Sequence, residues 1–199
     1  MKRYLVIAII LVAIFLGWYS LQTGETEEQY IDRILTERAE KETYFSSASD
    51  SPFNDIEFKG LSYFDPDQKY RIYAKLIPIE EKRMVNMVTN DDKVKRYREW
   101  SIAEFELDNT LNQLTIYEEA TGPFKGKLFL PFADGTSAVS TYGGGRYLDV
   151  KKPGTGTIEL DFNLAYNPYC AYAEGFSCPL PPPSNLLDVE INAGEKTYE

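Results

Sequence analysis

The stretch YRIYAKLI, residues 70–77, decides the fold class because its side chains alternate along the chain. One set of positions holds Tyr70, Ile72, Ala74 and Leu76, and the other holds Arg71, Tyr73, Lys75 and Ile77. A period of two residues is that of a β-strand with one buried face. We therefore predict a strand over this stretch.

Similar segments recur at short, regular spacing, and turn signals made of Asp, Asn, Gly and Pro separate them. Further strands are predicted over residues 83–89, 93–107, 113–119, 127–132, 146–150, 157–163 and 187–192. Beyond residue 46 the sequence has no clear helical period. It therefore predicts a mainly β domain, either an antiparallel sandwich or a barrel-like fold.

The predicted strand over residues 93–107 is long, since most strands have about three to ten residues. A strand of this length commonly crosses a corner of a barrel, where an extra residue bends the chain. We therefore predict a bend or a bulge near Trp100 and Ser101.

Composition limits the classes of protein to consider. The chain has 199 residues, of which 43% are hydrophobic, so it can form a core and suits one domain with an appended element. Its net charge is −10, and Lys and Arg form no extended stripe. Because phosphate contacts need clustered basic side chains, we predict that no nucleic acid is bound.

The sequence contains no histidine. This excludes Ser–His–Asp and Cys–His catalytic arrangements and every zinc site that uses histidine. Acid–base chemistry would have to use Asp, Glu, Tyr, Cys or Lys. No known catalytic motif is present, and we predict no metal and no cofactor.

Residues 4–21, YLVIAIILVAIFLGWYSL, carry no charge. Lys2 and Arg3 precede them and acidic residues follow, which favours a cytoplasmic N-terminus. A bilayer is spanned by roughly 20 residues, so we expect a membrane anchor over residues 1–22 and an extracytoplasmic, periplasmic main domain. A cleaved signal peptide is the alternative, although no small-residue cleavage site follows.

A helix is predicted after this stretch, within an acidic unit over residues 23–46. Thr26 and Gln29 have the spacing of a capping box, and the helix should end near Phe45. An apolar stripe is formed by Tyr30, Ile31, Ile34 and Leu35. We expect this amphipathic helix to pack on the β domain of residues 47–199, and a stalk or a docking helix for a protein partner is the alternative.

Specific motifs lie late in the chain: Asn167-Pro-Tyr-Cys-Ala-Tyr172, Cys178-Pro179 and Ala193-Gly-Glu-Lys196. Further matching pieces lie within residues 51–52, 58–64, 131–136, 141–149, 160–163 and 185–186. In these motifs, which cover roughly residues 44–196, the chain resembles the bacterial and archaeal family DUF1684, a domain of unknown function. The resemblance implies no activity, but it marks the late loop as the signature region.

This loop combines cysteines with prolines. In an exported domain Cys170 and Cys178 would form a disulfide, and free buried thiols or a metal-binding pair are the alternatives. The run Pro181-Pro182-Pro183 predicts a stiff polyproline strap. A stiff loop loses little entropy when it binds a ligand.

Polar and aromatic residues in and near the loop form the predicted site. Asp161 and Asn163 would share one strand face, and tyrosines recur every three residues after them. The candidate ligand-binding residues are Arg146, Tyr147, Asp161, Asn163, Tyr166, Asn167, Tyr172 and Glu195. The alternative is that the Asp and Asn side chains only cap the backbone of the loop.

Three functions follow as hypotheses. The first is a membrane-tethered domain that binds a small polar ligand, such as a sugar, beside the Cys- and Pro-rich loop. The second is a hydrolase or lyase that uses the carboxylates of Asp161 and Glu195. The third is an assembly module whose acidic helix or edge strand recruits a protein partner.

Overall fold

The computed structural model describes residues 3–4, 6, 9–14, 24–54, 56–154 and 156–199. Its elements are α2 (Glu27–Ser47), β1 (Arg71–Pro78), β2 (Met84–Val88), β3 (Val94–Leu107), β4 (Thr110–Glu119), β5 (Leu128–Phe132), β6 (Arg146–Val150) and β7 (Thr157–Asp161). Short 3₁₀ segments complete them: η1 (Gln68–Tyr70), η2 (Phe162–Leu164), η3 (Tyr169–Ala171) and η4 (Pro183–Asn185).

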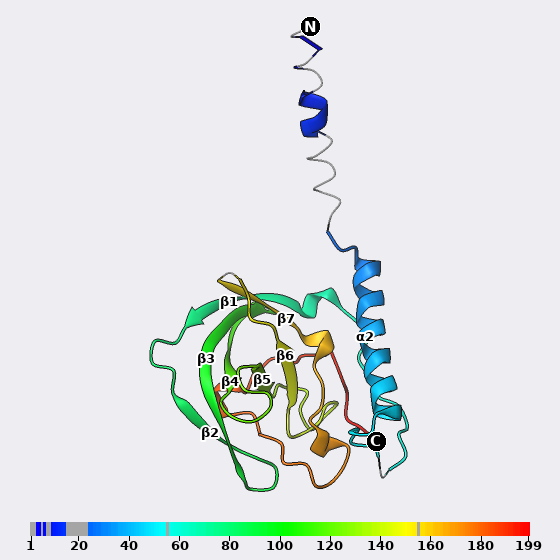
Figure 1. Cartoon of the computed structure of the whole chain (residues 1–199), viewed down its shortest axis with the longest axis vertical. Coiled ribbons are helices and arrows are strands. Elements are labelled where there is room, and N and C mark those ends of the chain that lie inside the picture. Colours follow the sequence, from blue (N-terminus) through cyan, green and yellow to red (C-terminus); the bar gives the residue numbers. More distant parts are fainter. Residues whose placement is uncertain (1–2, 5, 7–8, 15–23, 55, 155) are drawn as a thin grey trace.

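The seven strands form one antiparallel sheet in the order β6-β5-β4-β3-β1-β7, and β2 pairs with β3. The sheet curves into a half-barrel (Figure 1). Its first and last strands, β6 and β7, come within 8 Å of each other between Cα atoms without pairing as strands. One side of the half-barrel is therefore open along these two edges.

The core fills the concave side of the sheet, where alternate residues of the strands point inward. Its fully buried members include Ala74, Ala103, Leu114, Ile116, Leu130, Leu160, Phe162 and Ile191. From Ser101 to Leu107 every second residue of β3 is buried. This is the alternation that a sheet with one solvent-facing side requires.

A bulge interrupts the pairing of β3 with β4 between Glu99 and Ser101. The predicted irregularity near Trp100 and Ser101 is confirmed. Beyond it, β3 continues into a hairpin with β2, and Met87, Tyr97 and Tyr117 form a small separate cluster there. The bulge lets one long strand serve both the core and this hairpin.

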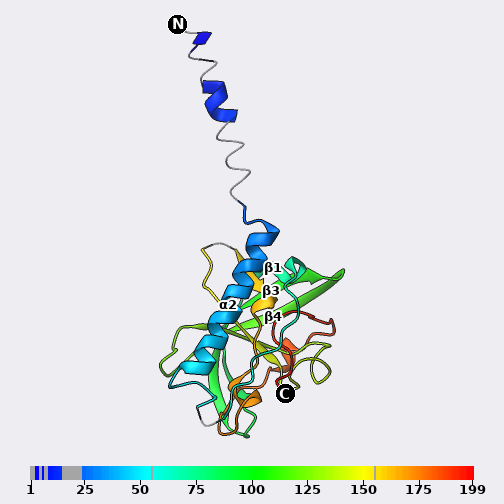
Figure 2. The same cartoon turned by 90° about the vertical axis from the view of Figure 1, so that its right-hand side faces the viewer.

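Helix α2 lies along the outside of the half-barrel (Figures 1 and 2). Thr26 and Gln29 make the predicted capping box, with both reciprocal hydrogen bonds. Its buried residues are Tyr30, Ile34, Arg38 and Phe45, whereas Leu35 is exposed. The helix is thus packed on the domain through one stripe, and that stripe contains a charged residue.

The predicted strand over residues 187–192 does not form. Leu187 and Ile191 are buried in the core, but their segment has the backbone of a loop. The Ile191 carbonyl accepts a hydrogen bond from Arg146 at 2.9 Å, and the Val189 carbonyl accepts one from the Gly135 amide at 2.9 Å. These contacts occupy backbone groups that a sheet ladder would use.

The predicted fold class also needs correction. All named strands belong to a single half-barrel sheet rather than to a sandwich of two sheets. The predicted transmembrane helix over residues 4–21 includes residues 5, 7–8 and 15–21, which lie outside the described residues. In the described part of the chain no helix is long and apolar enough to cross a bilayer. The predicted single-pass membrane location depended on that helix, and the described residues do not support it. An uncharged run of this length is at the lower limit for a span.

Candidate functional site

A cavity of about 520 Å³ lies between α2 and the open edges of β6 and β7. Its volume falls in the range of small-molecule sites, about 300–1,000 Å³. Five lining residues are cationic and four are acidic: Arg33, Arg38, Lys41, Lys151 and Lys152 against Glu37, Asp149, Glu159 and Asp161. In a chain of net charge −10, the cavity is thus richer in positive charge than the molecule as a whole.

The opening of the half-barrel positions this cavity. After β7 the chain turns through η2 and returns to the edge of β6, where Tyr147 and Tyr166 exchange backbone hydrogen bonds of 2.8 and 3.0 Å. The edges of β6 and β7 therefore form one side of the cavity, with apolar contributions from Leu148 and Ile158. Helix α2 forms the opposite side with its charged residues.

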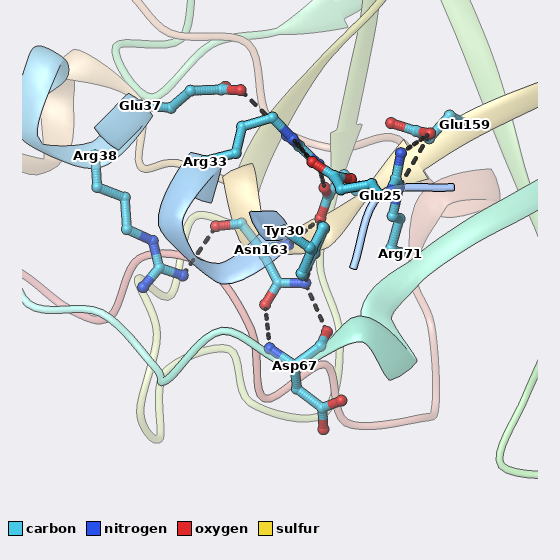
Figure 3. Close-up of polar contacts among 10 residues, drawn as sticks. Glu25, Tyr30, Arg33, Glu37, Arg38, Asp67, Arg71, Glu159 and Asn163 are labelled. Atoms are coloured by element: carbon cyan, nitrogen blue, oxygen red, sulfur yellow. Dashed lines mark hydrogen bonds and ion pairs between the residues drawn. The ribbon is translucent and has the colours of Figure 1, made fainter. Parts of the chain in front are cut away.

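Asp161 is the centre of a polar network beneath the first half of α2. Its partners Tyr30, Arg33 and Asn163 are labelled in Figure 3. Its carboxylate accepts hydrogen bonds from the Tyr30 hydroxyl at 2.9 Å and from the Asn163 amide at 3.2 Å, and it pairs with Arg33 at 3.5 Å. The Asn163 side chain donates to the Tyr30 hydroxyl at 2.7 Å and accepts from the Asp67 amide at 2.9 Å. Burial and the nearby carboxylate raise the pKa of Tyr30, which keeps its proton.

Glu195 is the centre of a second network beneath the end of the same helix. It is fully buried and pairs with Lys41 at 2.7 Å. It also accepts hydrogen bonds from the Asn167 side chain at 2.9 Å and from the Tyr172 hydroxyl. The Lys41 ammonium lies 4.7 Å from the centre of the Tyr166 ring, and burial lowers the pKa of Lys41.

Arg38 lies between the two networks and differs from the other cations. The residue is 8% exposed. Its guanidinium donates to the Phe64 carbonyl at 2.8 Å and to the Asn163 carbonyl at 3.0 Å, the latter drawn in Figure 3. It stacks 4.5 Å from the centre of the Tyr63 ring. Among the described residues no carboxylate pairs with it, and Arg38 Nε and the Tyr63 hydroxyl have no hydrogen-bond partner.

The structure brings only some of the predicted site residues to the cavity. Asp161, Asn163 and Tyr166 line it, whereas Asn167, Tyr172 and Glu195 lie behind Lys41 in the second network. Within these two networks Asp161 accepts from the Asn163 backbone amide, which is the local capping of the alternative interpretation, whereas Asn163 and Asn167 donate to the carbonyls of Asp67 and Lys196 in other parts of the chain.

Two further residues of the predicted site, Arg146 and Tyr147, contact other parts of the domain instead of the cavity. Arg146 is fully buried, pairs with Asp134 at 2.8 Å and donates to backbone carbonyls of the segment after η4. The Tyr147 hydroxyl donates to the Pro179 carbonyl at 2.6 Å. Neither residue lines the cavity. Both tie the C-terminal part of the chain to β6.

The predicted disulfide is wrong. Cys170 and Cys178 are both free thiols, and the Cys170 amide donates to Cys178 Sγ at 3.4 Å. The hydrogen bond from the Cys170 thiol lowers the pKa of Cys178 to about 7. The pair is thus held together by hydrogen bonds to sulfur rather than by a covalent bond.

Five residues of α2 were missed from the predicted site: Tyr30, Arg33, Glu37, Arg38 and Lys41. One signal in the sequence could have found Arg38. It follows Ile34 by four residues and Tyr30 by eight, so the helical period places a charge on the buried stripe. A charge at such a position needs a partner or a function.

Comparisons with known proteins agree with this architecture. No curated protein matches the chain. The chain is similar to the solution NMR structure of an uncharacterized protein of Haloarcula marismortui, with 40% identity, a TM-score of 0.66, and coverage of 85% of this chain and 95% of that one. Residues 56–196 match the family described as "Protein of unknown function (DUF1684)", a range that contains every strand but not α2. The chain therefore belongs to the DUF1684 family.

Proposed function

We propose that this domain binds a small polar ligand in the cavity between α2, β6 and β7. The observation that carries the proposal is the cavity itself, about 520 Å³ in volume and lined by polar side chains from four separate parts of the chain. Sites for small molecules combine an apolar surface with a few fixed polar groups. Here the apolar surface comes from Leu148, Ile158 and Leu164, and the polar groups come from α2, from Tyr63 and from the chain in and around β6 and β7.

Unpaired polar atoms among the lining residues support the proposal that the cavity binds a ligand. Arg38 and Tyr63 both line the cavity, and each has a buried polar atom without a partner among the described residues. Buried polar groups in folded proteins are nearly always hydrogen-bonded, and an unpaired one costs about 1–3 kcal/mol. Residues that line a cavity and retain unused hydrogen-bonding capacity are suited to a partner that enters from solution.

The networks behind the lining would keep this site preorganised. Asp161 and Glu195 hold Arg33 and Lys41 in place through ion pairs of 3.5 and 2.7 Å. Side chains that are already fixed lose little entropy when a ligand binds. Carboxylate catalysis is less well supported, because Asp161 lines the cavity while Glu195 is fully buried and engaged by three side chains.

The proposal is tested by blocking the cavity. Small molecules that co-purify with the full chain are identified by mass spectrometry, and a metabolite panel is screened by thermal shift and by NMR titration. Leu164→Trp places a bulky ring in the cavity, and Leu111→Trp adds the same ring at an exposed position outside the lining as a matched control.

We expect binding to be lost in Leu164→Trp and kept in Leu111→Trp. Equal binding by both variants contradicts the proposal. The same conclusion follows if no molecule in the panel perturbs the wild-type protein at residues that line the cavity.

A further inference from the structure

We infer that the ligand of this cavity carries an anionic group, a carboxylate or a phosphate, and that Arg38 of α2 is the residue that binds it. The inference rests on the proposed function and adds the chemical class of the ligand. It is carried by the juxtaposition of a cavity with a buried guanidinium that has no acidic partner among the described residues.

Other cationic side chains that line the cavity form ion pairs within the protein, whereas Arg38 does not. Arg33 pairs with Glu25 at 2.9 Å, Lys41 with Glu195 at 2.7 Å, and Lys152 with Glu118 at 2.8 Å. Each of these cations therefore has its charge compensated within the protein.

Besides Arg38, two charged lining residues form no ion pair in the described part of the chain, Lys151 and Asp149. Both are exposed, so water can solvate them. The Asp149 carboxylate also accepts a hydrogen bond of 2.9 Å from Tyr166. Arg38 is the buried cation of the lining that forms no ion pair with a described carboxylate, and Asp161 and Asp65 act on its charge only from beyond ion-pair distance.

Burial makes this arrangement costly without a ligand. A buried charge is expensive unless it is paired, and two carbonyl oxygens supply only dipoles. The Tyr63 ring adds a cation–π contact at 4.5 Å, which compensates a part of the charge. An anion beside Arg38 would supply the missing negative charge in a region shielded from water, where such an interaction is strong.

The chemistry of the neighbouring groups fits the same ligand class. A guanidinium is planar and offers its N–H donors in a fork that matches the oxygens of a carboxylate or a phosphate. Burial raises the pKa of Tyr63, so its hydroxyl keeps a proton to donate. Lys41 lines the same cavity, and Lys151 is exposed among the lining residues, where it can attract an anion from solution.

The experiment compares matched probes on the full chain by isothermal titration calorimetry and NMR. Glycerol 3-phosphate is compared with glycerol, and succinate with succinamide, so that each pair differs in charge on one skeleton. The phosphate and carboxylate arms also distinguish the two anions. Arg38→Gln removes the buried charge, and Arg96→Gln removes an exposed charge from β3 as a control.

We expect at least one anionic probe to bind about tenfold or more tightly than its neutral partner, and to lose about tenfold or more in affinity in Arg38→Gln but not in Arg96→Gln. The inference is overturned if the neutral probes bind the wild-type protein as tightly as the anions, or if folded Arg38→Gln keeps full affinity. If Arg38→Gln does not fold, the comparison of anionic with neutral probes on the wild-type protein tests the inference.

The two proposals fail in different ways. Binding of glycerol or succinamide that Leu164→Trp blocks, without any preference for the anions, keeps the proposed function and overturns the anionic ligand. No binding of any probe or panel compound in the cavity overturns both.

Discussion

The ammonium of Lys41 lies 2.7 Å from a carboxylate oxygen of Glu195, and this ion pair fixes the second half of α2 to the C-terminal segment. Glu195 is fully buried, while the Lys41 side chain is 24% exposed. The Asn167 side chain donates a further hydrogen bond to the same carboxylate at 2.9 Å. The contact therefore joins parts of the chain that are 154 residues apart.

Removing the lysine should destabilise the domain. Lys41→Met leaves the Glu195 carboxylate buried without its cation, and we expect a loss of about 3 kcal/mol in the free energy of unfolding, measured with urea. Lys69→Met is the matched control, because its ion pair with Asp108 at 2.7 Å is exposed and should contribute much less to stability. Equal losses in the two variants would refute the structural importance of the buried pair.

The Tyr30 hydroxyl should contribute to the docking of the helix. Tyr30→Phe removes the donor to Asp161 and leaves that carboxylate with one partner fewer in a buried position. We expect a loss of about 1–3 kcal/mol in the free energy of unfolding. Tyr73→Phe, at a residue that is 64% exposed, should change it by less than about 0.5 kcal/mol. A Tyr30→Phe variant as stable as the wild type would show that this network does not hold α2.

Gly145 should not tolerate a side chain. Its φ is +83°, and a Cβ there would lie 2.6 Å from the Phe132 carbonyl oxygen. Gly145→Ala should therefore cost about 2 kcal/mol or more through backbone strain and a steric clash. Gly154→Ala is the control, because its Cβ would meet no atom within 4 Å. Thermal unfolding of both variants checks the difference, and equal midpoints would contradict it.

The free energy of unfolding should depend on the Cys178 thiol between about pH 7 and 8.5. Its folded-state pKa of about 7 lies below that of a free thiol, about 8.5. The unfolded chain therefore binds more protons in this window, and the stabilisation rises with pH. It is complete above about pH 8.5 and is lost as the pH falls through 7.

The expected rise is about 1–2 kcal/mol relative to Cys178→Ser, measured by urea unfolding in a reducing buffer across the window. The titration of thiolate absorbance in the folded protein gives the pKa independently. Cys170 has a raised pKa and opposes the effect only at higher pH. A difference between wild type and Cys178→Ser that stays constant with pH would argue against a lowered pKa.

Local patterns predicted the strands well because they depend on nearby residues. The alternation over residues 70–77 became β1, at Arg71–Pro78, and the predicted irregularity near Trp100 became the bulge of β3. The capping box at Thr26 formed as predicted. In each case the deciding groups are a few residues apart, so short-range sterics and hydrogen bonds fix the outcome.

The cavity could not be predicted in the same way, because it arises where β6, β7 and α2 meet. Arg146 shows the difficulty: its sequence context suggested a ligand contact, and the fold instead supplies Asp134 and three carbonyls as partners. The disulfide was expected from a presumed cellular location rather than from geometry. Such contacts depend on long-range packing that no local pattern records.

The incomplete closure of the half-barrel has a consequence for how the proposed binding surface can diversify. One wall includes buried strand residues such as Leu148 and Ile158, which also pack in or beside the core, whereas the facing wall belongs to a single helix outside residues 56–196. Exposed and half-exposed positions on that helix can vary while the sheet keeps its pairing. Natural selection could thus retune recognition by replacing a few helical side chains on an unaltered scaffold.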